Sequence, residues 1–162
     1  MNIFYSELID NNRIELSKKE SHHCIHVMRM HLDDLVEVLD GKGNKYTCKI
    51  ISNNTRTVLE IIKKNSYPEK KFSIHIAIAP TKSHDRIDWF VEKSIELGVD
   101  EISFIKSQRS ERKRINFKRI NRIAVSAMKQ SGQYYLPKIN DLISFDKMIE
   151  SAKEKSLFIA HI

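Results

Sequence analysis

Lysine and arginine are concentrated in one short stretch of the chain, between Lys106 and Arg122. It holds eight basic residues and one acid, Glu111, for a net charge of +7. The rest of the chain balances at 20 basic against 20 acidic residues, because the whole contains 28 and 21. The eight are Lys106, Arg109, Arg112, Lys113, Arg114, Lys118, Arg119 and Arg122. Clustered cations displace counterions from phosphates, so this block favours a polyanion partner over a merely solvated helix face and loop.

A second group of residues with ligand chemistry surrounds Cys24. His22 and His26 stand four residues apart, an acceptable spacing for metal ligands on a helix, with His23 and His31 nearby. No glutamate completes an HExxH pattern, and no second cluster supplies closing ligands, so we expect no metal. His75, in an apolar run, is interpreted as a hydrogen-bonded core histidine, and Trp89 as a packing residue. The sequence contains no nucleophile elbow, P-loop or dinucleotide fingerprint.

The first third of the chain predicts short strands around one helix. Ser17 and Glu20 form a capping-box pattern, which predicts a helix through His22 to about Met30, with Met28 facing inward. A glycine turn is expected at 40–44 and a linker at 65–68. Strands are predicted at 3–5, 13–16, 35–39, 46–51 and 57–62. Several short strands at this spacing indicate a small β-barrel domain, for which we predict the limits 1–67.

From Phe72 onward the pattern changes to that of an α/β domain, predicted at 72–162. Strands are expected at 72–79, 99–105 and 157–162, the first of them buried on both faces. Helical spacing covers 85–97 and ends at Gly98, while Asn116 and Ser144 can cap two further helices. Alternating strands and helices predict right-handed crossovers over a parallel sheet. The fold class expected for the whole chain is therefore α/β, with an N-terminal barrel.

Length and composition set the remaining bounds. The chain has 162 residues, 41% of them apolar, which is enough for a core but includes no apolar run long enough to span a membrane. Its two cysteines are too few for a disulfide scaffold, so a cytoplasmic location is expected. Parallel sheets bind ligands beyond the carboxyl ends of their strands. All four glycines precede the last expected strand, which makes the α/β domain look incomplete.

Several motifs, in order, resemble the RsmE family, the small-subunit ribosomal RNA methyltransferases that modify N3 of a uridine. The motifs are residues 22–30 (HHCIHVMRM), 39–46 (LDGKGNKY), Lys82 with 92–99 (EKSIELGV), 107–112 (SQRSER), and 127–131 (AMKQS) with Pro137. The resemblance covers about residues 1–145. It implies a PUA-like barrel followed by a SPOUT-type methyltransferase domain. The family's arginine after the Gln-Ser pair is replaced here by Gln133, and its C-terminal knot has no counterpart.

The resemblance also implies an activity and partners. These are S-adenosylmethionine as cofactor, small-subunit ribosomal RNA or the assembled subunit as partner, and a homodimer for the full-length protein. Because the knot holds the cofactor, no cofactor-binding residue is expected in this chain, which would be an inactive fragment, and the catalytic residues stay unassigned. Family position and the basic block together suggest RNA contacts by Arg29, Lys45, Arg109, Arg112 and Arg122. The alternatives are a non-catalytic RNA-binding module and a structural α/β protein with a solvated basic block.

Overall fold

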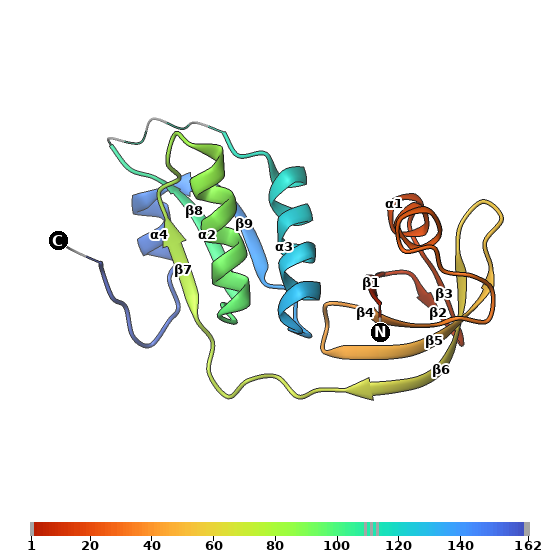
Figure 1. Cartoon of the computed structure of the whole chain (residues 1–162). Coiled ribbons are helices and arrows are strands. Elements are labelled where there is room, and N and C mark those ends of the chain that lie inside the picture. Colours follow the sequence, from red (N-terminus) through yellow and green to blue (C-terminus); the bar gives the residue numbers. More distant parts are fainter. Residues whose placement is uncertain (1, 109, 111, 113, 161–162) are drawn as a thin grey trace.

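The computed structural model of the chain describes residues 2–108, 110, 112 and 114–160. It contains two separate sheets, one in each half of the sequence, joined by an extended connector that runs along one side of the molecule (Figure 1). The first sheet ends with β6 at Ser66 and the second begins with β7 at His75. A two-part α/β architecture is thereby confirmed, while the domain limits 1–67 and 72–162 stay predictions.

The N-terminal sheet has six strands in the order β1-β4-β5-β6-β3-β2, and it curls around its own core. β1 pairs with β4 in parallel, and the other neighbours are antiparallel. Alternate side chains point inward, as expected for strands with one buried face. The elements are β1 (Ile3–Tyr5), β2 (Ile9–Asp10), β3 (Arg13–Glu15), α1 (Lys18–His22), η1 (His23–Val27), β4 (Leu35–Leu39), β5 (Asn44–Ser52) and β6 (Val58–Ser66).

The C-terminal part is a parallel three-stranded sheet in the order β7-β8-β9. Helices α2 and α3 pack on one face of it, where Ile102 and Phe104 of β8 meet Val91 and Ala124 in a fully buried core. The elements are β7 (His75–Ile78), α2 (His84–Glu96), β8 (Glu101–Lys106), α3 (Phe117–Ser131), β9 (Lys138–Ser144) and α4 (Phe145–Ser151). Ser83, Asn116 and Ser144 cap the three helices through their side chains, the last two as predicted.

The helix expected up to Met30 is shorter and less regular than predicted. Only Lys18–His22 is α-helical, and His23–Val27 continues as one turn of π-helix. Met28 is 38% exposed rather than directed inward. The extra residue in the π turn rotates the following side chains out of the helical register from which the prediction was made.

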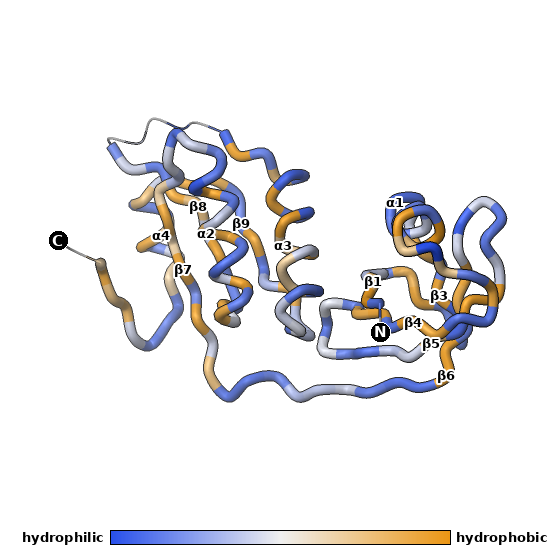
Figure 2. Tube along the Cα trace, in the orientation of Figure 1, coloured by the Kyte–Doolittle hydropathy of each residue, from blue (hydrophilic) through white to orange (hydrophobic). Residues whose placement is uncertain are grey.

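The α/β part differs from the prediction in four ways. Strand β9 was not predicted, because its polar residues Lys138, Asn140 and Asp141 interrupt the apolar alternation. Conversely, residues 157–160 of the strand predicted at 157–162 form no strand, and residues 161–162 lie outside the described residues. Phe158 is 94% exposed, so an apolar composition alone (Figure 2) does not make this segment a strand. Trp89 is 64% exposed on α2 and does not pack in the core. β7 is also only partly buried.

His75 has hydrogen-bond partners on both ring nitrogens, as interpreted from the sequence. Its Nε2 lies 2.8 Å from Ser103 Oγ, and its Nδ1 lies 2.5 Å from Glu154 Oε1. The Glu154 contact ties the segment after α4 to the sheet face opposite α2 and α3. The carboxylate is favoured by this bond, which lowers the pKa of Glu154 below its usual value.

The two parts are joined by what we call the clasp, formed by the turn at Gly41–Gly43 and residues 134–136. Backbone N–H groups of Gly43 and Leu136 donate to the carbonyls of Tyr134 and Gly41, at 3.0 and 2.9 Å. Lys42 and Tyr135 form an isolated antiparallel bridge. The glycine turn predicted from the sequence therefore also fixes how the first sheet meets the second.

Candidate nucleic-acid interface

A groove lies between α1 and β1 of the N-terminal part and α3 of the C-terminal part. Figure 1 shows α3 on the side of the C-terminal part that faces α1. It consists of two adjoining hollows of about 470 and 520 Å³ that share Lys19, Glu20, Arg122 and Val125. One wall is the exposed face of α3, and the other is the start of α1 with the loop after β1. We refer to it below as the α1–α3 groove.

Four Lys and Arg side chains line the α1–α3 groove, and three of them form no ion pair with the described residues. Lys19 comes from α1, and Lys118 and Arg122 come from successive turns of α3. All three are exposed. Arg122 Nε donates to the Lys118 carbonyl at 3.3 Å, but none of the ion pairs in the described part of the chain includes any of the three. Their charge is therefore available to an anion that enters the groove.

A fourth cation in the groove, Lys129, is already neutralised. Its Nζ lies 2.9 and 3.0 Å from the two carboxylate oxygens of Glu20, and both side chains are mostly buried. Glu20 also accepts a hydrogen bond from the Tyr5 backbone at 3.1 Å. This corrects half of the predicted capping box: the Ser17 hydroxyl does accept from Glu20 N–H, but the Glu20 carboxylate bonds to Tyr5 and Lys129.

Of the five RNA contacts suggested by the sequence, the four that the structure describes do not lie together. Arg122 lines the α1–α3 groove. Arg29 is exposed, at a left-handed φ of 54°, just after η1. Lys45 pairs with Glu37 at 2.9 Å, and this hydrogen bond raises the pKa of Lys45. Arg109 lies outside the described residues.

Arg112 connects two loops. Its guanidinium donates to the carbonyls of Thr81 and Lys82 and lies 3.3 Å from His84 Nδ1. These acceptors follow β7, while Arg112 itself follows β8. Its contacts therefore hold together the loops at the carboxyl ends of neighbouring parallel strands.

Those carboxyl ends are where an α/β sheet places a ligand. Beyond β8, Ser107 and Ser110 hydrogen-bond through their hydroxyls at 3.0 Å. The segments 79–83 and 107–116 contain hydroxyls and basic side chains but no glycine that would allow a close backbone approach to a cofactor. We assign these residues no cofactor contact.

Sequence reasoning missed Lys19 as a groove residue and counted Lys118 only as one of the basic block. Lys19 lies within the capping-box pattern between Ser17 and Glu20, and that pattern predicts only a residue in the first turn of a helix. The long-range packing of α1 opposite α3 places it beside Arg122, and no local pattern records that packing.

Other chemistries receive no support from the described residues. No group of three or more His, Cys, Asp or Glu in the described ranges is placed to hold a metal ion. Within those ranges no helix is both long and apolar enough to cross a membrane. Burial raises the pKa of Cys24 to about 11 and that of Cys48 to about 12, so both remain protonated thiols at neutral pH.

Comparison with known proteins adds a family to this geometry. The model of an RNA methyltransferase domain matches residues 68–162, and that of an RNA methyltransferase PUA domain matches residues 16–62. The ribosomal RNA small subunit methyltransferase E of Buchnera aphidicola is 29% identical over 145 residues, which are 85% of this chain and 57% of that protein. Its namesake from Bacillus subtilis is 24% identical over 86% of this chain and 57% of its own length.

Solved structures agree with these matches. A probable rRNA methyltransferase from Porphyromonas gingivalis is 36% identical, with a TM-score of 0.84 over 92% of this chain and 63% of that one. The ribosomal RNA small subunit methyltransferase E of Neisseria gonorrhoeae, solved with S-adenosyl methionine, is 23% identical and shares the fold, with a TM-score of 0.83. The match covers 94% of this chain and 66% of that one. The chain spans a little over half the length of the curated relatives that it matches. Two domain models in their expected order and these relatives show that the chain belongs to the RsmE family of RNA methyltransferases.

Proposed function

We propose that this chain takes part in the S-adenosylmethionine-dependent methylation of uridine N3 in small-subunit ribosomal RNA, and that its own share is RNA binding. The observation that carries the proposal is the α1–α3 groove with its three cations outside ion pairs, Lys19, Lys118 and Arg122. Membership in the RNA methyltransferase family and the names of the relatives support the reaction class. The cytoplasm, where ribosomal subunits mature in bacteria, is the expected compartment.

The target atom explains why RNA must be held in a defined shape. N3 lies on the Watson–Crick edge of uridine, so the base must be unpaired before a methyl group can reach it. N3 also loses its proton when the new N–C bond forms. Contacts to the RNA backbone supply affinity and register, while the shape of the RNA and its loop bases supply specificity.

The chain's own residues divide these tasks. Lys19, Lys118 and Arg122 bind phosphates in the α1–α3 groove, and Arg29 extends the basic surface. Arg109, which lies outside the described residues, is kept as a further RNA contact on the family resemblance alone. Lys45 and Arg112 already have protein acceptors, so a phosphate at Lys45 shares the lysine with Glu37, and one at Arg112 shares the guanidinium with the loop after β7. S-adenosylmethionine supplies the methyl group when bound. The homodimer implied by family resemblance belongs to the same proposal.

A second candidate function is an RNA-binding module without methyl transfer. It is favoured by the loops after β7 and β8, which lack a glycine-lined cradle for the cofactor. The two functions share the RNA interface and differ in one measurable product, a methylated uridine.

The test combines a binding and a product measurement on the same chain. Unmodified small-subunit ribosomal RNA is titrated with wild-type chain, Arg122→Gln and Lys147→Gln, the last a matched change on the exposed face of α4. We expect Arg122→Gln to weaken binding and to reduce the salt slope by about 0.7–0.9, and Lys147→Gln to change neither. Equal slopes for both variants would exclude the α1–α3 groove as the RNA site.

The product is measured by incubating the RNA with the chain and S-adenosylmethionine, followed by mass spectrometry of the nucleosides. Appearance of 3-methyluridine supports the methyltransferase. RNA binding without it supports the binding module and contradicts catalysis by this chain.

A further inference from the structure

A second basic segment lies away from the α1–α3 groove, on the last four residues of β6 and the extended stretch that follows them toward β7 (residues 63–73, called the connector below). Its first nine residues contain four lysines and one acid, Glu69, with Tyr67 in the middle. Lys63, Lys64, Lys70 and Lys71 are exposed. Figure 2 shows this stretch as largely hydrophilic along the edge of the molecule. Lysines that alternate with an aromatic residue are typical of surfaces that bind single-stranded nucleic acid.

The aromatic residue of the connector belongs to a stacked pair. The rings of Tyr67 and Tyr134 are nearly parallel, at 5°, with centroids 3.6 Å apart. Both side chains are half-buried. Their hydroxyls interact, and this hydrogen bond raises the pKa of Tyr134. The clasp fixes the pair, because Tyr135 Oη donates to the Tyr67 carbonyl at 2.6 Å and the Tyr67 N–H donates to Gly43 at 2.8 Å.

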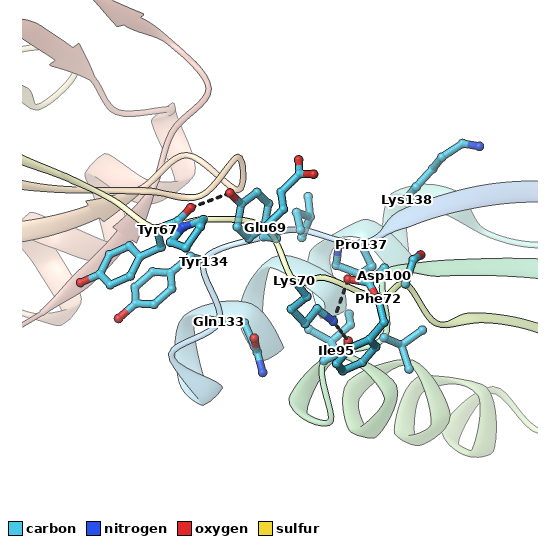
Figure 3. A pocket seen from close by; sticks show the side chains of 16 residues that line it. Tyr67, Glu69, Lys70, Phe72, Ile95, Asp100, Gln133, Tyr134, Pro137 and Lys138 are labelled. Carbon is cyan, nitrogen blue, oxygen red and sulfur yellow. Dashed lines mark hydrogen bonds and ion pairs between the residues drawn. The ribbon is translucent and has the colours of Figure 1, made fainter.

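A cavity of about 390 Å³ lies beside the stacked pair (Figure 3). Its walls come from the connector, from the corner between α2 and β8, and from the segment between α3 and β9. This is the amino-terminal edge of the parallel sheet, opposite the loops held by Arg112. A volume of this size falls within the range of small-ligand sites.

Of the four charged residues in the cavity wall, Lys70 and Asp100 pair with each other, Lys138 pairs with Glu101 outside the wall, and Glu69 is exposed. Lys70 Nζ lies 2.7 Å from Asp100 Oδ1, and Lys138 Nζ lies 2.9 Å from Glu101 Oε1. Gln133 is held by a hydrogen bond from its Nε2 to the Glu96 carbonyl at 3.3 Å. A wall of balanced charges, an amide and aromatic rings suits a flat neutral group with polar edges. Lys63, Lys64 and Lys71, further along the connector, suit the phosphates attached to such a group.

We propose that this junction cavity binds one unpaired base of a single-stranded RNA segment, stacked on the Tyr67–Tyr134 pair, while the connector lysines contact the adjoining phosphates. The inference rests on the proposed RNA-binding function and adds a second, single-strand-specific site to it. The junction cavity and the connector then bind only unpaired RNA, whereas the α1–α3 groove binds the RNA backbone whether or not its bases are paired. Gln133 is positioned to meet the polar edge of the base.

The test uses a short fluorescein-labelled oligouridylate and an RNA duplex as probes, with the full chain and two variants at one position. Tyr134→Leu removes the ring but keeps apolar bulk, and Tyr134→Phe keeps the ring. Loss of one base–aromatic contact should weaken oligouridylate binding by about tenfold in Tyr134→Leu and leave duplex binding unchanged. Tyr134→Phe should bind both probes like the wild type. Unchanged oligouridylate binding in Tyr134→Leu, or an equal loss for the duplex, would overturn the proposal.

A second readout does not depend on the folding of any variant. A single-stranded RNA with a fluorescent adenine analogue, whose emission falls on stacking, is titrated with the wild-type chain. Quenching at saturation is expected for a base stacked on tyrosine, and unchanged emission of the bound RNA contradicts it. Arg122→Gln separates the two proposals. If it weakens binding of both probes while Tyr134→Leu weakens binding of neither, the α1–α3 groove is supported as an RNA site and the junction cavity is contradicted. If wild-type chain binds neither probe, RNA binding itself fails.

Discussion

The clasp and the α1–α3 groove are both contacts between the same two parts of the molecule, yet they are built in different ways. At the clasp the backbones approach closely, and hydrogen bonds of 2.8–3.0 Å run between Gly41–Gly43 and its neighbours. At the groove the parts are linked by the Glu20–Lys129 ion pair, and the remaining cations, Lys19, Lys118 and Arg122, are exposed. One contact fixes the arrangement of the two parts, and the other leaves charge available for a ligand. Changes at the clasp should therefore alter stability, while changes to the groove cations should alter binding.

Gly43 is the residue on which the clasp depends most. Its φ is 89°, and a Cβ at this position would lie 2.2 Å from the Tyr135 hydroxyl oxygen. Gly43→Ala combines backbone strain with this overlap and should lower the free energy of unfolding by about 2–4 kcal/mol. Urea denaturation of the variant beside the wild type measures the loss.

Gly132→Ala is the matched control for this variant. Gly132 has a similar φ of 71°, but a Cβ there would have no heavy atom within 4 Å. It should cost only the strain of about 1–2 kcal/mol. Equal losses in the two variants would show that the close approach at the clasp contributes nothing beyond the backbone conformation.

The next effect concerns the ion pair that bridges the groove. Lys129→Met leaves the mostly buried Glu20 carboxylate with the Tyr5 N–H and no cation, and we expect a loss of about 1–3 kcal/mol of unfolding free energy. Adding Glu20→Gln removes the stranded charge and should restore part of that loss. A double-mutant cycle by urea denaturation checks this coupling. Additive losses would mean that the pair does not join the two parts.

Much of this architecture could be predicted from local sequence. Helix α2 was expected at 85–97 and is found at His84–Glu96, because a strict apolar period and Gly98 mark its face and its end. Asn116 and Ser144 cap helices as predicted, since a cap depends only on neighbouring N–H groups. The turn at 40–44 was recognised from its glycines.

Local sequence did not predict the ion pairs and hydrogen bonds between residues that are distant in the chain. Glu20 reads as a capping-box residue, yet its carboxylate bonds to Lys129, 109 positions away. The sequence suggests that Lys45 and Arg112 are free to contact RNA. In the structure Lys45 forms an ion pair with Glu37, and Arg112 donates hydrogen bonds to the loop after β7. The net charge does not reveal the connector lysines as a basic cluster, because acidic residues elsewhere balance them outside residues 106–122. Charge counts predict that a polyanion is bound, whereas the position of the site depends on which cations find partners.

The groove cations should affect RNA affinity with little effect on stability. Lys19→Gln together with Lys118→Gln removes two of the three groove cations that form no ion pair with the described residues. The salt slope should fall by about 1.4–1.8, and affinity near physiological salt by about tenfold or more. Titration of small-subunit ribosomal RNA at several salt concentrations gives both quantities. If the double variant changes the midpoint of urea denaturation but not the salt slope of RNA binding, the groove cations contribute to stability and not to RNA binding.

The smallest effect tests whether the clasp acts through side chains as well as backbone. Tyr135→Phe removes only the hydroxyl that donates to the Tyr67 carbonyl at 2.6 Å, and one such hydrogen bond contributes about 0.5–1.5 kcal/mol. The Tyr135 ring still lies against Gly43, because its Cζ and Cε1 remain within 2.9 Å of the ideal Cβ position there. Tyr135→Phe should therefore not rescue Gly43→Ala, whereas Tyr135→Ala should reduce the cost of Gly43→Ala to backbone strain. If Tyr135→Phe alone rescues Gly43→Ala, the conflict is with the hydroxyl, and the close packing of backbone against ring is not what limits residue 43 to glycine.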